Sequence, residues 1–157
     1  MSSKVLPTAQ AVGKLIASLV GRNATAQPTQ AFKQVPKGAV VAVCVDEAKK
    51  TVAIIVADVA VAAAAGASLA MIPASAAQDA ARNGILPQNI ADNFREVANV
   101  MTSLFTAGSG RVVRLAEFAV GTVPEEAGPV LAGPGGRLDL EIEVQGYGKG
   151  VLSLLVV

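Results

Sequence analysis

Residues 86–105 read LPQNIADNFREVANVMTSLF and carry the clearest helical pattern in the sequence. Apolar side chains recur in it at steps of three and four residues, so at helical pitch they form one apolar face that a globular domain would bury. Pro87 suits the first turn of this helix, and Gly108 with Gly110 suits its end. The apolar face consists of Ile90, Phe94, Val97, Met101, Leu104 and Phe105.

The opposite face of the same helix is polar. Its carboxylate, amide and hydroxyl groups line up, because residues three and four positions apart are neighbours on a helix surface. A row of this kind is ordinarily a solvated surface, so by itself it leaves a solvent role and a binding role open. We call this row the polar stripe, and its members are Asn89, Asp92, Glu96, Asn99 and Ser103.

Composition bounds the fold and excludes one class of partner. The chain has 157 residues, enough for one domain with a core, and 52% of them are apolar but only 3% aromatic. The core must therefore be built from aliphatic side chains. A net charge of +1 gives no electrostatic footprint for a phosphate backbone, and few aromatics are present for bases to stack on. We therefore expect no nucleic-acid partner.

The lack of histidine excludes several chemistries. It removes the usual general base near neutral pH and every Ser-His or Cys-His arrangement. The single cysteine, Cys44, lies in the apolar run 40–45, which predicts a buried and unreactive thiol. No disulfide can form within the chain and no signal peptide is evident, so we expect a cytoplasmic protein.

Residues 52–72 are long enough to cross a bilayer, and Asp58 is their only charged side chain. However, the segment is rich in Ala and Gly, which insert weakly, and an Asp at a helix centre costs about 2.5–3.5 kcal/mol. We therefore predict a buried strand over 51–56 followed by an Ala-rich helix over 59–71, and no membrane span.

The remaining elements follow from periodicity and from turn residues. Thr8 and Gly21 are suited to begin and end a first helix, and residues 1–7 are expected to be flexible. Residues 151–157 are apolar enough for a central strand. The other expectations are a loop or short edge strand over 23–37, a hairpin of strands 40–45 and 51–56, a helix over 75–82, strands over 111–120 and 138–145, a loop over 121–136 and a turn over 146–150.

The two halves of the chain repeat each other. Residues 12–20 align without gaps on residues 97–105, and each helix is followed by a Val-Pro pair and a hairpin. This order predicts a single α+β domain over residues 1–157 with a pseudo-twofold repeat, in which helices pack on a mainly antiparallel sheet. The first copy has Ala11 and Lys14 where the second has Glu96 and Asn99. Any site on the polar stripe therefore occurs once per chain.

The spacing of Asp92, Glu96 and Asn99, with Pro124 some two dozen residues later, resembles the signature of the CheC/CheX/FliY group of chemotaxis phosphatases. The length and the pseudo-repeat are most similar to CheX-like members. The resemblance implies the CheX/CheC fold, a homodimer joined through sheet edges, and hydrolysis of the aspartyl phosphate of a CheY-like response regulator.

The resemblance also implies roles for residues of the stripe. A carboxamide is neither acid nor base at neutral pH, so Asn99 would orient the attacking water by hydrogen bonds alone. Glu96 would pair with a lysine of the partner. Asp92 and Ser103 are expected to contact the partner, and Pro124 to fix a loop. No cofactor of its own is expected, because the partner would supply the phospho-aspartate and the Mg²⁺.

Two alternatives remain open. The chain could be a noncatalytic interaction module of the same fold, like the middle domain of flagellar switch proteins. It could also be an unrelated enzyme that binds phosphate at a glycine-rich loop, either 108–111 or 133–137. Neither loop has the strand-to-helix context of a nucleotide-binding loop, so both are expected to be turns.

Overall fold

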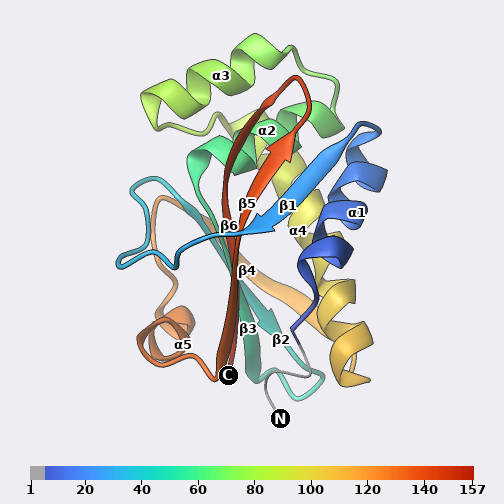
Figure 1. Ribbon diagram of the computed structural model, residues 1–157. Helices are drawn as coiled ribbons and strands as arrows, with labels where there is room; N and C mark the ends of the chain where they lie inside the picture. The colour runs from blue at the N-terminus through green and yellow to red at the C-terminus, as the bar shows by residue number, and fades with distance from the viewer. Residues whose placement is uncertain (1–5) are drawn as a thin grey trace.

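The computed structural model describes residues 6–157, which form one antiparallel sheet with helices on both faces (Figure 1). α1, α2 and α4 pack on one face, and α3 lies beyond α2. The helices are α1 (Ala9–Val20), α2 (Val59–Leu69), α3 (Ala74–Asn83), α4 (Gln88–Ser109) and α5 (Gly128–Ala132), with a 3-10 turn η2 (Glu125–Ala127). The strands are β1 (Ala24–Pro28), β2 (Val40–Val45), β3 (Thr51–Ala57), β4 (Arg114–Val120), β5 (Gly136–Val144) and β6 (Gly148–Val156).

The order of strands shows the predicted pseudo-twofold repeat. The sheet runs β1-β5-β6-β3-β2-β4. Exchanging β1 with β4, β2 with β5 and β3 with β6 gives the same order read from the other edge of the sheet. The pseudo-twofold axis therefore passes between β6 and β3. Each edge strand pairs with the hairpin of the other half, β1 with β5 and β4 with β2. The two halves are therefore interlocked in one sheet.

The two long helices of the repeat are buried at matching positions. Val12 and Val97 are fully buried, and so are their partners one turn on, Ile16 and Met101. Such agreement is expected when two helices occupy equivalent places on one sheet. It confirms the gap-free alignment of residues 12–20 with residues 97–105.

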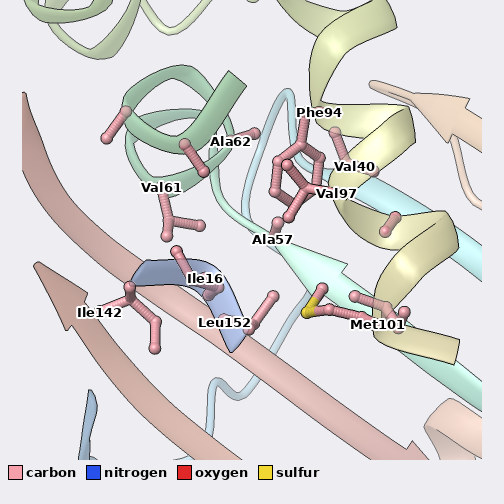
Figure 2. Close-up of a cluster of buried hydrophobic side chains, with 14 of the residues drawn as sticks. Ile16, Val40, Ala57, Val61, Ala62, Phe94, Val97, Met101, Ile142 and Leu152 are labelled. Atoms are coloured by element: carbon pink, nitrogen blue, oxygen red, sulfur yellow. The ribbon is translucent and has the colours of Figure 1, made fainter. Parts of the chain in front are cut away.

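The main core lies between these helices and the sheet. Figure 2 shows Val61 of α2 and Phe94 of α4 in the same apolar layer as Ile142 and Leu152 of the strands. α2 lies close to α4 because its side chains there are small. A Cβ on Gly66 would stand 2.5 Å from the carbonyl oxygen of Ile90. This close approach fixes the position of α4 over the sheet.

A second, smaller apolar cluster covers part of the other face. Ala127 of η2 and Val130 of α5 pack there on Val41, Ile54 and Leu155 of the sheet. The sequence predicted only a loop over 121–136, and this prediction was wrong in one respect. Two short helical turns form because Ala127 and Val130 are buried against the apolar side chains that β2 and β3 place on this face.

The other expected elements are confirmed with shifts at their ends. Thr8 caps α1, Gly21 ends it, β1 is the short edge strand, and β6 is central. Two details differ: Gly108 lies within α4, which ends at Gly110 with φ of 72°, and the turn expected over 146–150 is tighter, since β6 begins at Gly148. Residues 1–5 of the expected flexible end lie outside the described part, and Leu6 packs against the main core.

Residues 52–72 are divided between β3, α2 and the turn after it. Across residues 6–157 the structure contains no helix with the length and hydropathy needed to cross a membrane. Cys44 of β2 is buried as predicted, and burial raises the pKa of its thiol to about 12.

Candidate functional site

α4 is the element that carries the polar stripe, and neighbouring elements hold it in place along its length. Near its start, the ring centroid of Phe94 lies 6.3 Å from that of Phe118 in β4. Near its end, the backbone N–H of Val113 donates a hydrogen bond of 3.0 Å to Thr106 Oγ1. With the close approach of Gly66 in α2, these contacts make α4 a rigid support for the side chains on its outer face.

All members of the polar stripe are exposed: Asn89, Asp92, Glu96, Asn99 and Ser103. The residues of α4 that are buried lie on the opposite side of the helix, among them Phe94, Val97 and Met101. The structure therefore brings the predicted site residues together on one outward face. The chain itself does not cover them.

Hydrogen bonds divide the stripe into two groups. Asp92 Oδ1 accepts a hydrogen bond of 2.7 Å from Gln88 Nε2, and Ser103 Oγ donates one of 2.7 Å to the carbonyl oxygen of Val100. Within residues 6–157, by contrast, the side chains of Asn89, Glu96 and Asn99 make no hydrogen bond or ion pair. Asp92 and Ser103 are thus engaged within their own helix, whereas Glu96 and Asn99 are free to bind an external group.

Sequence reasoning missed Arg95, which lies between the stripe and β4. Its guanidinium carbon is 5.8 Å from the centre of the Phe118 ring. The only available signal was its position four residues before Asn99, which places the two side chains on adjacent parts of the helix surface.

Pro124 is not brought to the stripe. It is the N-cap residue of η2, which packs on the other face of the sheet from α4. Its expected role of fixing a loop stays a prediction. Between Asn99 and Pro124 the chain forms the rest of α4, all of β4 and the turn that leads to η2.

The two glycine-rich segments are turns only in part: Gly108 and Ser109 belong to α4, and Gly136 and Arg137 belong to β5. Gly110 ends α4 in the left-handed region, and Gly133 follows the last residue of α5. Both segments lead from a helix into a strand, so neither presents a helix N-terminus to a phosphate. In the part of the chain that the structure describes, no three His, Cys, Asp or Glu side chains gather as a metal site would require.

Asp58 is a partly buried carboxylate at the start of α2, and its role is structural. Its two oxygens accept hydrogen bonds of 2.9 Å from the backbone N–H groups of Val61 and Val151. Burial raises the pKa of this carboxyl group, although both hydrogen bonds act to lower it. Asp58 thereby joins the start of α2 to β6, away from the stripe.

No protein-family model matches this sequence, and no curated protein matches it. Solved structures do match. The FliM middle domain from H. pylori has a TM-score of 0.67 at 8% identity over 94% of this chain and 84% of that one. It has also been solved as a FliG-FliM complex, with a TM-score of 0.62 at 9% identity over 94% of this chain and 85% of that one.

Two further structures extend the comparison. FliY from Thermotoga maritima has a TM-score of 0.56 at 11% identity, covering 99% of this chain and 86% of that one. CheX from Borrelia burgdorferi, solved in a complex with CheY, BeF3 and Mg²⁺, has a TM-score of 0.55 at 12% identity, covering 94% and 93%. The resemblance that the motif predicted is confirmed at the level of the fold: this chain has the α+β fold shared by CheX, FliY and the FliM middle domain.

Proposed function

We propose that this protein removes the phosphoryl group from the aspartyl phosphate of a CheY-like response regulator. The observation that carries the proposal is the pair Glu96 and Asn99, exposed one turn apart on α4 and unpaired within residues 6–157. The similar CheX structure contains CheY, which supports a receiver domain as the class of partner.

In this proposal α4 enters the active site of the receiver and Asn99 aligns the attacking water. The amide can accept a hydrogen bond from the water and donate one to a phosphoryl oxygen, but it cannot take a proton. Orientation suffices because phosphoryl transfer depends mainly on positioning and charge stabilisation. The water oxygen bonds to phosphorus while the bond between phosphorus and the aspartyl oxygen breaks, so the aspartate is released as a carboxylate and the protons of the water leave with the inorganic phosphate.

Glu96 acts as an anchor. Its free carboxylate would pair with a lysine of the receiver and so set the register of α4 against the partner. Asp92 and Ser103 flank the pair and would contact the rim of the partner. The receiver brings the Mg²⁺, and a cytoplasmic location is part of the proposal.

The sheet also supports a proposal about oligomeric state. β1 and β4 are the two edge strands, and β1 ends at Pro28, which lacks an N–H to donate. β4 has seven residues and no proline, so it is the edge better suited to pair with a second copy. We propose a homodimer in which the two copies pair through β4. Analytical ultracentrifugation of the wild type and of Ala116→Pro, a change at an exposed position of β4, would test it.

A noncatalytic interaction module is the second candidate. The likeness to FliM, which was solved in a complex with FliG, favours it. In that case the stripe would be a docking surface without chemistry. Binding would depend on the face of α4, and Asn99→Ala would have no effect on any phosphoryl group.

The test uses receiver domains from the same genome, selected because they bind this protein when activated with BeF3. Each is phosphorylated with a small phosphodonor, and decay of the aspartyl phosphate is followed with and without the protein. We expect decay at least about tenfold faster with the protein, and Glu96→Lys should weaken association. Binding with unchanged decay in every receiver would reject the phosphatase proposal and support the interaction module.

A further inference from the structure

Arg95 lies beside the candidate pair on α4. It precedes Asn99 by four residues, so the Cβ atoms of the two side chains are about 5–6 Å apart on the helix surface. Arg95 is exposed, and it occupies the flank of the stripe that faces β4. An arginine can span such a distance, so its guanidinium can reach a group that Asn99 contacts.

An aromatic ring holds the guanidinium in place. Its central carbon lies 5.8 Å from the centre of the Phe118 ring, within the range of a cation-π contact. Phe118 is itself held by its packing on Phe94. The guanidinium therefore lies on the β4 side of the polar stripe, over a ring that is itself packed in place.

No acid of the described chain neutralises this charge. The carboxylate one turn earlier, Asp92, accepts its hydrogen bond from Gln88 instead. Glu96, the next residue, points about 100° further around the helix and has no ion pair in residues 6–157. Arg95 thus offers a fork of N–H donors with no hydrogen-bond partner within this part of the chain.

A planar guanidinium is the side chain best matched to phosphoryl and carboxylate oxygens, which it binds with two parallel hydrogen bonds. In phosphoryl transfer, an arginine supplied by a partner protein stabilises the charge that spreads over the equatorial oxygens in the transition state. Building on the proposed function, we infer that Arg95 binds an anionic oxygen of the phosphorylated receiver while Asn99 aligns the water.

The anionic oxygen has two possible sources, the phosphoryl group and a carboxylate at the rim of the receiver. Arg95→Met keeps the aliphatic stem over Phe118 and removes the charge, and Arg95→Lys keeps the charge but loses the fork. Arg114→Met is the matched control, because Arg114 is exposed and lies opposite Val45, whose side chain packs into the cluster on the far face. Thermal unfolding within about 2 °C of the wild-type midpoint will show that each variant is folded.

The test measures kcat and KM for decay of the phosphorylated receiver, and affinity for the same receiver with and without BeF3. If Arg95 binds the phosphoryl group, Arg95→Met lowers kcat about 10- to 100-fold with little change in KM, and Arg95→Lys recovers part of it. If it binds a rim carboxylate, KM rises about 10-fold, kcat is unchanged, and affinity falls with or without BeF3. Either result supports the inference.

If kcat, KM and affinity for Arg95→Met equal those for Arg114→Met, the inference about Arg95 is overturned. If Asn99→Ala abolishes the acceleration in the same assay, the proposed function stands and only the role of Arg95 fails. If the wild-type protein accelerates no receiver, both fail together.

Discussion

Glu96 and Asn99 are separated by one turn of α4, and within residues 6–157 neither side chain is bonded to another residue. At the pseudo-symmetric place on α1 the corresponding residues are Ala11 and Lys14. The fold therefore provides two equivalent helix faces, of which only one carries a carboxylate and an amide. This asymmetry makes Lys14 a position-matched control for Asn99.

Gly66 should be required for the contact between α2 and α4. In Gly66→Ala the new Cβ would lie 2.5 Å from the carbonyl oxygen of Ile90 and 3.2 Å from the backbone nitrogen of Phe94, so the helices must separate. We expect a loss of about 1–3 kcal/mol in the free energy of unfolding, measured in urea. Gly128→Ala is the control, since a Cβ there meets nothing within 4 Å. Equal stability of both variants would contradict the close packing.

Asp139 should contribute to stability at neutral pH and lose that contribution in acid. It accepts hydrogen bonds of 2.9 and 2.8 Å from Arg137 and of 2.6 Å from Ser153. Burial alone would raise the pKa of Asp139, but these hydrogen bonds and the charge of Arg137 together lower it. Because the folded pKa lies below the unfolded one, the stabilisation is present above about pH 4 and is lost as the pH falls through the folded pKa.

Asp139→Asn should therefore lower the free energy of unfolding by about 2–3 kcal/mol at pH 7 and reduce its fall below about pH 4. Denaturant unfolding at a series of pH values measures both effects. Glu141→Gln removes one negative charge from an exposed position on the same strand and serves as the control. If the free energy of unfolding of Asp139→Asn falls below about pH 4 as steeply as that of the wild type, the contact between Asp139 and Arg137 is not the cause of that fall.

Cys44 should not react with thiol reagents while the protein is folded. Its pKa of about 12 leaves almost no thiolate at about pH 8, and the side chain is fully buried. Alkylation followed by mass spectrometry should therefore show modification only when denaturant is added. Rapid labelling of the native protein would mean that β2 opens far more often than a central part of the core should.

Local pattern was enough to predict α4 and its outward face. The apolar residues of 86–105 follow the helical period closely, and burial of Phe94 and Met101 then places Glu96 and Asn99 outside. For the sheet, the sequence predicted a mainly antiparallel arrangement but not which strands pair. The pairing of β1 with β5, for example, joins residues more than a hundred positions apart. No local period carries that information.

The parts that sequence reasoning missed depend on tertiary contacts. Residues 125–132 contain glycine and proline that indicate a loop, yet burial of Ala127 and Val130 on the sheet stabilises helical turns there. Arg95 looked like an ordinary surface charge, because its relation to Phe118 exists only once β4 lies beside α4. The assigned roles of Asp92, Glu96, Asn99 and Ser103 remain predictions that the experiments must decide.

The role of Asn99 is measured by the single-turnover rate of receiver dephosphorylation at saturating protein, compared between wild type, Asn99→Ala and Lys14→Ala. Misplacing the attacking water costs on the order of 100-fold in rate, so we predict at least that loss for Asn99→Ala, with affinity for the BeF3-activated receiver kept within about threefold. Lys14→Ala should match the wild type within about twofold, as expected for an exposed residue on α1 outside the stripe. An Asn99→Ala protein as fast as the wild type would show that Asn99 does not position the attacking water.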